Sequence, residues 1–315
     1  MTENVYQIKK HELGKRVDVV LTKKINTFSR NYIINLIKTG KVKVNKTIIY
    51  SPATKLKELG FINVNNKDIK TTIKKTNLKL DIIFEDESII VINKKAGVLT
   101  HASIGNTSTS LVDIILEKGI NLYISKEEQR AGVVHRLDKD TTGTIVFAKT
   151  ELASNFLMQQ FFLRKVDKIY EAIVWGKANP LMGKINIPIA NFNKKKKASI
   201  NKDAKSALTE YKTLQTTNNN FSLVECKIFT GRTHQIRIHM LSISCPLVGD
   251  PLYSKGRNLS SKIANKDVLA VKKFKRQALH SKQLGFIHPL TKKSMTFNAI
   301  KPDDFLALEN TLFNN

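Results

Sequence analysis

The sequence predicts an α+β fold in which helices and loops flank a mixed, largely antiparallel sheet, with a small α/β module in front of it. The chain has 315 residues, of which 41% are hydrophobic, so it can bury a sizeable core and exceeds the usual size of one domain. Short strand-like runs dominate residues 80–315, whereas the first quarter of the chain shows helical periodicity and is strongly basic. We therefore expect a module at 1–66, a linker at 67–79 and a body at 80–315.

The charge distribution indicates a polyanionic partner. The formal net charge is +27, and residues 1–79 contain 18 Lys and Arg against 5 Asp and Glu, which is about half of the excess on a quarter of the chain. A basic segment in front of a less polarised body is typical of a nucleic-acid-binding module. A lysine-rich surface that serves only solubility, in a chain rich in Lys, Asn and Ile, is the alternative.

The first module should contain two helices and a hairpin. Apolar residues recur at helical spacing on either side of a turn at residues 26–28: Val17, Val20, Leu21 and Ile25, then Ile33, Ile34, Leu36 and Ile37. Gly40 is suited to end the second helix. Alternation over residues 41–45 and the return at 47–50 predict paired strands. With FSR before the second helix and GKVKVN after it, residues 14–64 resemble an S4-type RNA-binding domain.

The start of the second helix is a candidate phosphate contact. Ser29, Arg30 and Asn31 offer a hydroxyl, a guanidinium and free backbone N–H groups there. A plain helix N-cap explains Ser29 equally well. The polar, Lys- and Thr-rich stretch at residues 65–79 has little periodicity and is expected to be the linker.

Apolar runs in the body predict its strands. Residues 82–84 and 89–92, separated by an acidic turn, predict a strand pair, and further strands are expected at 144–148, 169–175, 209–214 and 222–228. Residues 152–162 show a helical pattern. This mixture favours an antiparallel sheet with helices packed on it.

Several classes of protein lack support in the sequence. No apolar run approaches the length of a membrane-spanning helix, and the first residues, MTENVYQIKK, do not resemble a secretory signal, so we expect a cytoplasmic protein. Cys226 and Cys245 are too few for a disulfide framework or a thiolate zinc site. Motifs for phosphate loops, dinucleotide binding, zinc proteases and α/β-hydrolases are absent.

A polar loop is the first candidate for chemistry. Residues 132–143, GVVHRLDKDTTG, lie between apolar runs and directly precede a predicted strand. A polar loop held near a sheet in this way is a natural place for a functional site. Local ion pairs among Arg136, Asp138 and Asp140 explain the composition equally well.

A second polar cluster is GRTHQIRIHM at residues 231–240. In a helix, Thr233, Ile236, Arg237 and Met240 would share one face, so Arg237 would lie among core residues and need a carboxylate partner. His234 and His239 are five residues apart, which is poor spacing for a shared metal, and no metal site is expected. Only nine of the 53 basic residues are Arg, and five lie at or beside polar motifs: Arg30, Arg130, Arg136, Arg232 and Arg237.

Together the motifs resemble the RluA/RluD family of RNA pseudouridine synthases. HRLDKDTTG, KIYEAIVWG, GRTHQIRIHM, VGDPLY and RQALH occur in the family's order and separation, and with the N-terminal module they are most similar to the RluD type, which acts on large-subunit ribosomal RNA. Two segments depart from the family pattern: Lys94-Lys95-Ala96-Gly97, where Lys-Pro-Ala-Gly is usual, and Thr100-His101-Ala102, where Val-His-Pro is usual. Both departures lie outside the catalytic motif and bear on local turns.

The resemblance implies an isomerase that needs neither a cofactor nor a metal. A uracil is cut from C1′ of its ribose, rotated and rejoined through C5, with no hydrolysis and no net redox change. Asp138 matches the catalytic carboxylate, and its attack on the sugar and its removal of a ribose proton both remain open. Arg237 matches the arginine that pairs with it. Tyr170 matches the aromatic that stacks on the base and removes the C5 proton, although a Tyr in a strand is otherwise a common core residue.

The same resemblance implies how RNA is held. Arg136 matches the arginine that fills the space left by the flipped nucleotide. We expect further RNA contacts from the same motifs and from the first module: His135, Arg232, His234, Gln235, Ser29 and Arg30. The expected partner is 23S rRNA or its precursor, bound by a monomer that uses no nucleotide cofactor and no membrane. A tRNA or another rRNA site, and a non-catalytic role in ribosome assembly, are the alternatives.

Overall fold

A computed structural model describes most of the chain. The described residues are 4–25, 30–65, 78–101, 109–124, 131–192, 195–198, 203–217, 220–254 and 263–314. Ser29 and residues 67–77 of the expected linker lie outside them. The chain divides into two compact units, one of residues 1–76 and 101–131 and the other of residues 77–100 and 132–315. The first unit therefore includes residues 101–131, with α3 (Leu111–Glu117), in addition to the basic module.

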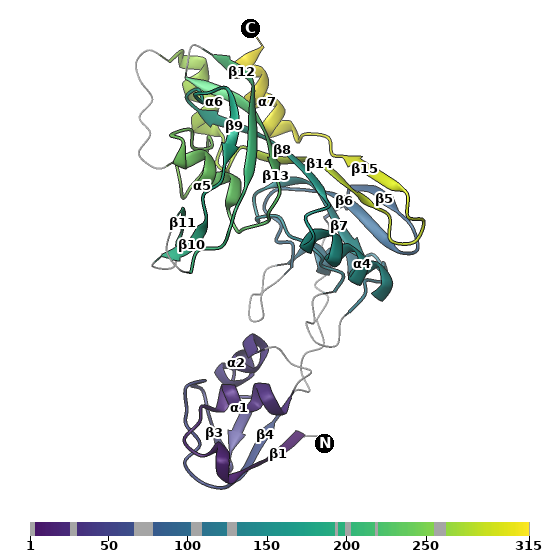
Figure 1. Cartoon of the computed structure of the whole chain (residues 1–315), viewed down its shortest axis with the longest axis vertical. Coiled ribbons are helices and arrows are strands. Elements are labelled where there is room, and N and C mark those ends of the chain that lie inside the picture. Colours follow the sequence, from purple (N-terminus) through teal and green to yellow (C-terminus); the bar gives the residue numbers. More distant parts are fainter. Residues whose placement is uncertain are drawn as a thin grey trace. The chain divides into compact units, whose positions relative to one another are not determined.

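The basic module is a four-stranded antiparallel sheet with two helices (Figure 1). The strand order is β1 (Asn4–Ile8), β4 (Gly60–Val64), β2 (Val42–Val44) and β3 (Thr47–Ile48), and the helices are α1 (Val17–Lys24) and α2 (Arg30–Lys38). A 3-10 turn spans Lys10–Glu12. Both predicted helices and the hairpin are confirmed, whereas β1 and β4 were not predicted. The apolar faces of the helices pack on Ile62 and Val64, and Gly40, with a φ of +70°, follows α2.

The second unit is built on a nine-stranded mixed sheet, which confirms the predicted α+β class. Its order is β5 (Ile82–Glu85), β6 (Ile89–Lys94), β7 (Thr142–Ala148), β14 (Leu279–Ile287), β8 (Asp167–Trp175), β13 (Phe221–Ile228), β12 (Thr209–Thr217) and β9 (Met182–Ile185), with β15 (Ser294–Asn298) beside β14. All of these pairs are antiparallel except β14 with β7. A separate hairpin joins β10 (Ile189–Phe192) to β11 (Lys195–Ala198).

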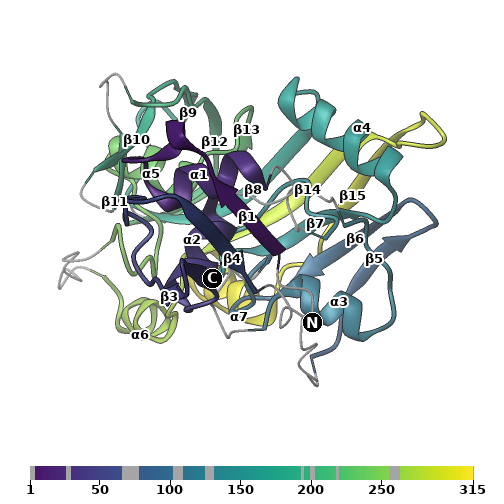
Figure 2. The same cartoon turned by 90° about the horizontal axis from the view of Figure 1, so that it is seen from below.

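Helices bury two separate parts of this sheet. α4 (Glu151–Phe162) places Ala153 and Leu157 against β6, β7 and β14, whereas α6 (Asn265–Lys273) and α7 (Asp303–Phe313) cover β8 and β13. Figure 2 shows α4 well separated from α6 and α7. Side chains alternate along β8, so Ile173 and Trp175 face the second core while Lys168 and Tyr170 point to the opposite face. In the described part of the chain, no helix combines the length and the apolarity needed to span a bilayer.

Strand β14 brings distant segments together. It lies between β7 and β8 in the sheet, and it begins at Leu279, within the RQALH motif. The parallel pairing with β7 needs a glycine at position 143, because a Cβ there would lie 2.1 Å from the carbonyl oxygen of Ser281, and Gly143 has a φ of +110°. The loop that precedes β7 is thereby held next to β8.

Buried cations fix that loop. Lys94, which is 1% exposed, donates hydrogen bonds from Nζ to the carbonyl oxygens of Lys95, Val98 and Lys139 at 2.8–2.9 Å. Arg276 donates to the carbonyl oxygen of Asp140 at 3.2 Å while binding the Asp304 carboxylate with two N–H groups. Both cations bond to carbonyl groups of the two residues that follow Asp138, so they restrict where its side chain can lie.

Replacing Lys94 should loosen this loop. Lys94→Met leaves three carbonyl groups without their donor, so we expect the free energy of unfolding to fall by about 3 kcal/mol or more. Urea unfolding of the full chain, followed by circular dichroism, measures the change. The matched control is Lys95→Met, because the Lys95 side chain is exposed and only its carbonyl takes part. Equal stability of the two variants would show that the buried ammonium is dispensable.

Candidate active site

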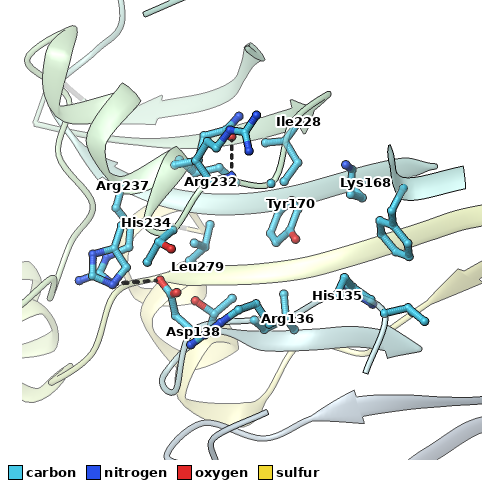
Figure 3. A pocket seen from close by; sticks show the side chains of 18 of the residues that line it. His135, Arg136, Asp138, Lys168, Tyr170, Ile228, Arg232, His234, Arg237 and Leu279 are labelled. Atoms are coloured by element: carbon cyan, nitrogen blue, oxygen red, sulfur yellow. Dashed lines mark hydrogen bonds and ion pairs between the residues drawn. The ribbon is translucent and has the colours of Figure 1, made fainter. Parts of the chain in front are cut away.

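The predicted motifs meet in a cavity of about 350 Å³ in the second unit. It is lined by the loop before β7, the end of α4, strand β8 and the segment from β13 into α5 (Gln235–Ser242). Eight predicted site residues line it: His135, Arg136, Asp138, Tyr170, Arg232, His234, Gln235 and Arg237. Figure 3 shows Asp138 near Arg237 and His234 at one side, Tyr170 in the middle, and Lys168 and His135 at the other side.

Asp138 is held by a buried arginine. Arg237 Nη1 donates to Asp138 Oδ2 at 3.1 Å, and its Nε and Nη2 donate to the two carboxylate oxygens of Asp250 at 2.6 and 2.9 Å. The side chains of Arg237 and Asp250 are 4% and 0% exposed, whereas that of Asp138 is 19% exposed. One guanidinium therefore joins a buried carboxylate to a carboxylate that opens into the cavity, which confirms the expected carboxylate partner for Arg237.

The electrostatics keep this guanidinium charged. Burial lowers the pKa of Arg237, but the hydrogen bonds and charge of Asp250, and then of Asp138, raise it above its ordinary value. Asp250 also accepts the backbone N–H groups of Leu252 and Tyr253 at 2.9 and 3.1 Å, so its orientation is fixed from several sides. Asp138 thus faces a permanent positive charge that is fixed in place.

His234 borders the same carboxylate. Its Nε2 lies 3.8 Å from Asp138 Oδ2, and its Nδ1 is hydrogen-bonded to the Tyr253 hydroxyl at 2.9 Å. Burial lowers the pKa of His234 below its ordinary value, Asp138 opposes this shift and Arg237 adds to it, so a neutral imidazole is favoured at neutral pH. The residue has a left-handed backbone, with a φ of +60°, directly before α5. A strained backbone of this kind persists only where the surrounding structure holds it, and here it fixes the direction of the imidazole ring.

Tyr170 occupies the middle of the cavity, opposite a bulge. His280 pairs with Glu171 and Gln283 with Ile169, so two residues of β14 face Tyr170 alone. Tyr170 is 6% exposed. Burial raises the pKa of its hydroxyl to about 12, a hydrogen bond with Ser281 opposes this shift, and the charge of Asp138 adds to it. The hydroxyl is therefore protonated at neutral pH, which favours stacking by the ring over removal of a proton by the oxygen.

Two predicted RNA contacts are used within the protein instead. Gln235 is 3% exposed, and its amide oxygen accepts from Thr230 Oγ1 and the Arg232 N–H while its nitrogen donates to Leu208 O and Thr209 Oγ1. His135 Nε2 accepts the N–H of Val146 at 3.0 Å, and its ring stacks on Phe161. Sequence patterns do not distinguish such internal hydrogen bonds from contacts with a ligand. We therefore assign both side chains to positioning the loops.

The remaining predicted residues differ in whether other protein groups hold their side chains. Arg136 is exposed and makes no hydrogen bond or ion pair with any residue that the structure describes, whereas Arg232 Nε donates to the Ser206 carbonyl. Arg30, in the first unit, is half-exposed and binds buried Asp18 at 2.8 Å together with Arg16. Thr233 does not lie on the expected helical face, because α5 begins only at Gln235. Ile236 and Met240 are buried as predicted.

Sequence reasoning missed the residues behind the cavity wall. Asp250 and Tyr253 belong to VGDPLY, and the isolated Asp in that apolar segment was a usable signal for a buried charge that needs a partner. Lys168, two residues before Tyr170, was also overlooked. Among the described residues, no cluster of His, Cys, Asp and Glu is arranged to hold a metal ion.

Comparisons with known proteins agree with this geometry. Residues 88–242 match the model of the RNA pseudouridylate synthase family. Ribosomal large subunit pseudouridine synthase D of Buchnera aphidicola subsp. Acyrthosiphon pisum is 38% identical over 298 residues, covering 94% of each chain, and the protein of that name in Haemophilus influenzae is 36% identical over 97% of this chain and 94% of its own.

A solved structure supports the same relationship. Human RNA Pseudouridylate Synthase Domain Containing 4 superposes with a TM-score of 0.58 and 26% sequence identity, covering 74% of this chain and 92% of its own. The sequence relatives extend over nearly the whole length, including the basic module. The cavity built around Asp138, Tyr170 and Arg237 therefore lies in a chain that belongs to the RNA pseudouridylate synthase family.

Proposed function

We propose that this pseudouridine synthase modifies uridines of 23S rRNA during maturation of the large ribosomal subunit, with Asp138 as its catalytic carboxylate. The names of its full-length relatives support the choice of ribosomal RNA. The observation that carries the assignment of Asp138 is its position, open to the cavity and bound to a guanidinium that buried Asp250 holds from behind. A tRNA or another rRNA uridine is the alternative substrate.

The proposed reaction begins at C1′ of the target ribose. Asp138 either forms a bond to C1′ or removes a ribose proton, and in both routes the C1′–N1 bond breaks and its electron pair leaves with the uracil. The uracil then rotates, and C5 forms the new bond to C1′ as the Asp138–C1′ bond breaks or the ribose proton is returned. The C5 proton is then lost to a base, and N1 gains a proton. Every route needs an ionised Asp138, which Arg237 favours, and a face on which the freed base is held, which the ring of Tyr170 offers.

RNA binding is divided between two parts of the chain. The target nucleotide must leave its stack to reach a carboxylate inside the cavity. Arg136, which is exposed and has no partner among the described residues, is suited to replace it in the RNA. We infer that the basic module, resembling an S4-type domain, adds affinity through phosphate contacts and takes no part in the chemistry. The enzyme would act as a monomer in the cytoplasm, where ribosomes are assembled.

Asp138→Asn should abolish turnover without unfolding the protein. Asn keeps the size and most of the hydrogen bonding of Asp, but it supplies neither a nucleophile nor a base. We expect tritium release from rRNA labelled with [5-³H]uridine to fall by at least about 1,000-fold while RNA affinity stays the same. Substantial residual turnover would move the catalytic role to another residue.

The two arginines should affect the reaction differently. Arg237→Lys keeps a positive charge but loses the planar fork that binds Asp250 with two nitrogens and Asp138 with the third, so Asp138 should be held less well and the rate should fall equally on a folded stem-loop and on a short unstructured RNA. Arg136→Ala should leave the pH profile unchanged and slow a folded stem-loop more than a short unstructured RNA. Single-turnover rates against pH on both substrates measure this. Identical behaviour of the two variants would contradict the division of roles.

The basic module should contribute to the salt dependence of binding. Replacing exposed Lys38, Lys55 and Lys57 by Gln removes three charges while leaving the core of the module unchanged. Fewer counterions are then released, so rRNA affinity should fall and the slope of log affinity against log salt should flatten. The rate at saturating enzyme should not change. An unaltered slope would show that these lysines do not contact the RNA.

A further inference from the structure

Lys168 is a second buried cation that lines the cavity, and its surroundings differ from those of Arg237. It lies on β8 two residues before Tyr170, so the two side chains point to the same face of the sheet, and both line the cavity. Figure 3 shows Lys168 on the side of Tyr170 away from Asp138. Only 5% of its surface is exposed.

The ammonium of Lys168 has no partner in the described part of the chain. No hydrogen bond or ion pair reaches its Nζ, and its nearest aromatic neighbour is the ring of Phe161, whose centroid is 5.8 Å away. Lys94, the other buried lysine in this unit, satisfies its three N–H groups with three carbonyl oxygens. A buried charge without a partner is costly, so a side chain kept in this state in a binding cavity is suited to meet a group that arrives with the ligand.

The neighbouring charges do not replace such a partner. The pKa of Lys168 is lowered to about 8, first by burial and then by the charge of Arg164, while the charge of Asp167 opposes the shift. His135, packed on the same Phe161 ring, has a pKa lowered to about 3, first by burial and then by the charge of Lys168, and is neutral. The ammonium is therefore still mostly protonated near pH 7. Its surroundings favour contact between this charge and an electronegative group of a ligand.

We propose that Lys168 binds a carbonyl oxygen of the target uracil and stabilises the negative charge that the base carries after the C1′–N1 bond breaks. The inference rests on the proposed function, in which Asp138 acts at C1′ and Tyr170 carries the base. A base that extends from Asp138 across Tyr170 presents its far edge to Lys168. Because Lys168 is almost fully buried, the base, which enters the cavity, is favoured as its partner over a phosphate, which stays at the mouth.

Electron balance gives the ammonium a role in the chemical step. When the C1′–N1 bond breaks, the electron pair remains on N1 and is delocalised onto the two carbonyl oxygens of uracil. A hydrogen bond from Lys168 to one of these oxygens becomes stronger as the charge develops, which lowers the barrier without any transfer of the lysine proton. The charge is neutralised when C5 bonds to C1′, and the base stays neutral overall when the C5 proton leaves and N1 gains a proton.

The symmetry of uracil lets one ammonium serve both orientations. Rotation of the base by half a turn about its N3–C6 axis exchanges N1 with C5 and, at the same time, O2 with O4. A cation that faces one carbonyl oxygen before the rotation therefore faces the other afterwards. Cytosine would present an amino group in one of the two orientations, so the same contact would select uracil.

The test compares Lys168→Met with Lys165→Met, a matched loss of one lysine on the exposed turn before β8. On an rRNA stem-loop, we expect the single-turnover rate at saturating enzyme to fall about 100-fold in Lys168→Met, as for other single donors to a developing anion, with no change in Kd. Lys165→Met should react like the wild type. The thermal midpoint of free Lys168→Met should be unchanged or higher, because an unpaired buried charge has been removed.

Different outcomes would overturn the inference in recognisable ways. A rate within about threefold of wild type would exclude a role in the chemical step. A weaker Kd and a flatter salt slope at an unchanged rate would indicate a phosphate contact, and a lowered thermal midpoint together with the lost rate would indicate a structural role. In the wild type, the rate at limiting enzyme should fall above about pH 8 as free Lys168 loses its proton, and this loss should be absent from Lys168→Met. If the wild type and Lys165→Met are both inactive on the stem-loop, the proposed substrate has failed instead.

Discussion

The bidentate ion pair between Arg237 and Asp250 is the interaction on which the site depends. Breaking a buried pair of this kind leaves an uncompensated charge, so the structure around it must keep both partners in place. Backbone N–H groups fix Asp250, the helix α5 fixes Arg237, and Nη1, the guanidinium nitrogen that does not bind Asp250, donates to Asp138. The Asp138 carboxylate is thus held in position by Arg237 and, through it, by Asp250, and these residues need not contact RNA.

The sheet topology makes that contact available. Asp138 precedes β7, and Tyr170 belongs to β8, yet these strands are not neighbours; β14, from near the end of the chain, lies between them. β14 pairs in parallel with β7, which it approaches closely at Gly143, and antiparallel with β8, where a bulge lies opposite Tyr170. The loop that carries Asp138 is then held by Lys94 and Arg276, which bond to the backbone carbonyls of the two residues that follow it, Lys139 and Asp140.

Local patterns predicted the parts of the structure whose signals are local. The helices of the basic module, α4 and the main strands β5 to β8 and β12 to β13 follow from apolar periodicity, and the family motifs marked the loop and the start of α5. β14 was missed because its pairing joins residues more than 100 positions apart and its sequence mixes polar and apolar residues. The internal hydrogen bonds of Gln235 and His135 were not predicted for a related reason: a polar side chain in a motif looks the same whether it bonds to RNA or to a neighbouring loop. The left-handed backbone of His234 has no sequence signal at all, since the residue is not a glycine.

The two buried cations that line the cavity, Arg237 and Lys168, illustrate how protein partners divide work between stages of a reaction. Arg237 is paired before any substrate arrives, so its charge is already balanced and its contribution is to hold Asp138 in place. Lys168 has no hydrogen-bond or ion-pair partner among the described residues, so a group of the ligand is suited to balance its charge. A cation that is paired with a protein carboxylate stabilises the enzyme before substrate binds. A cation without such a partner instead stabilises the reaction state in which the ligand carries the most negative charge. In the proposed reaction the uracil is an anion only between its two neutral forms, so this state is the intermediate. Lys168 lies on the face of the sheet where the base would turn.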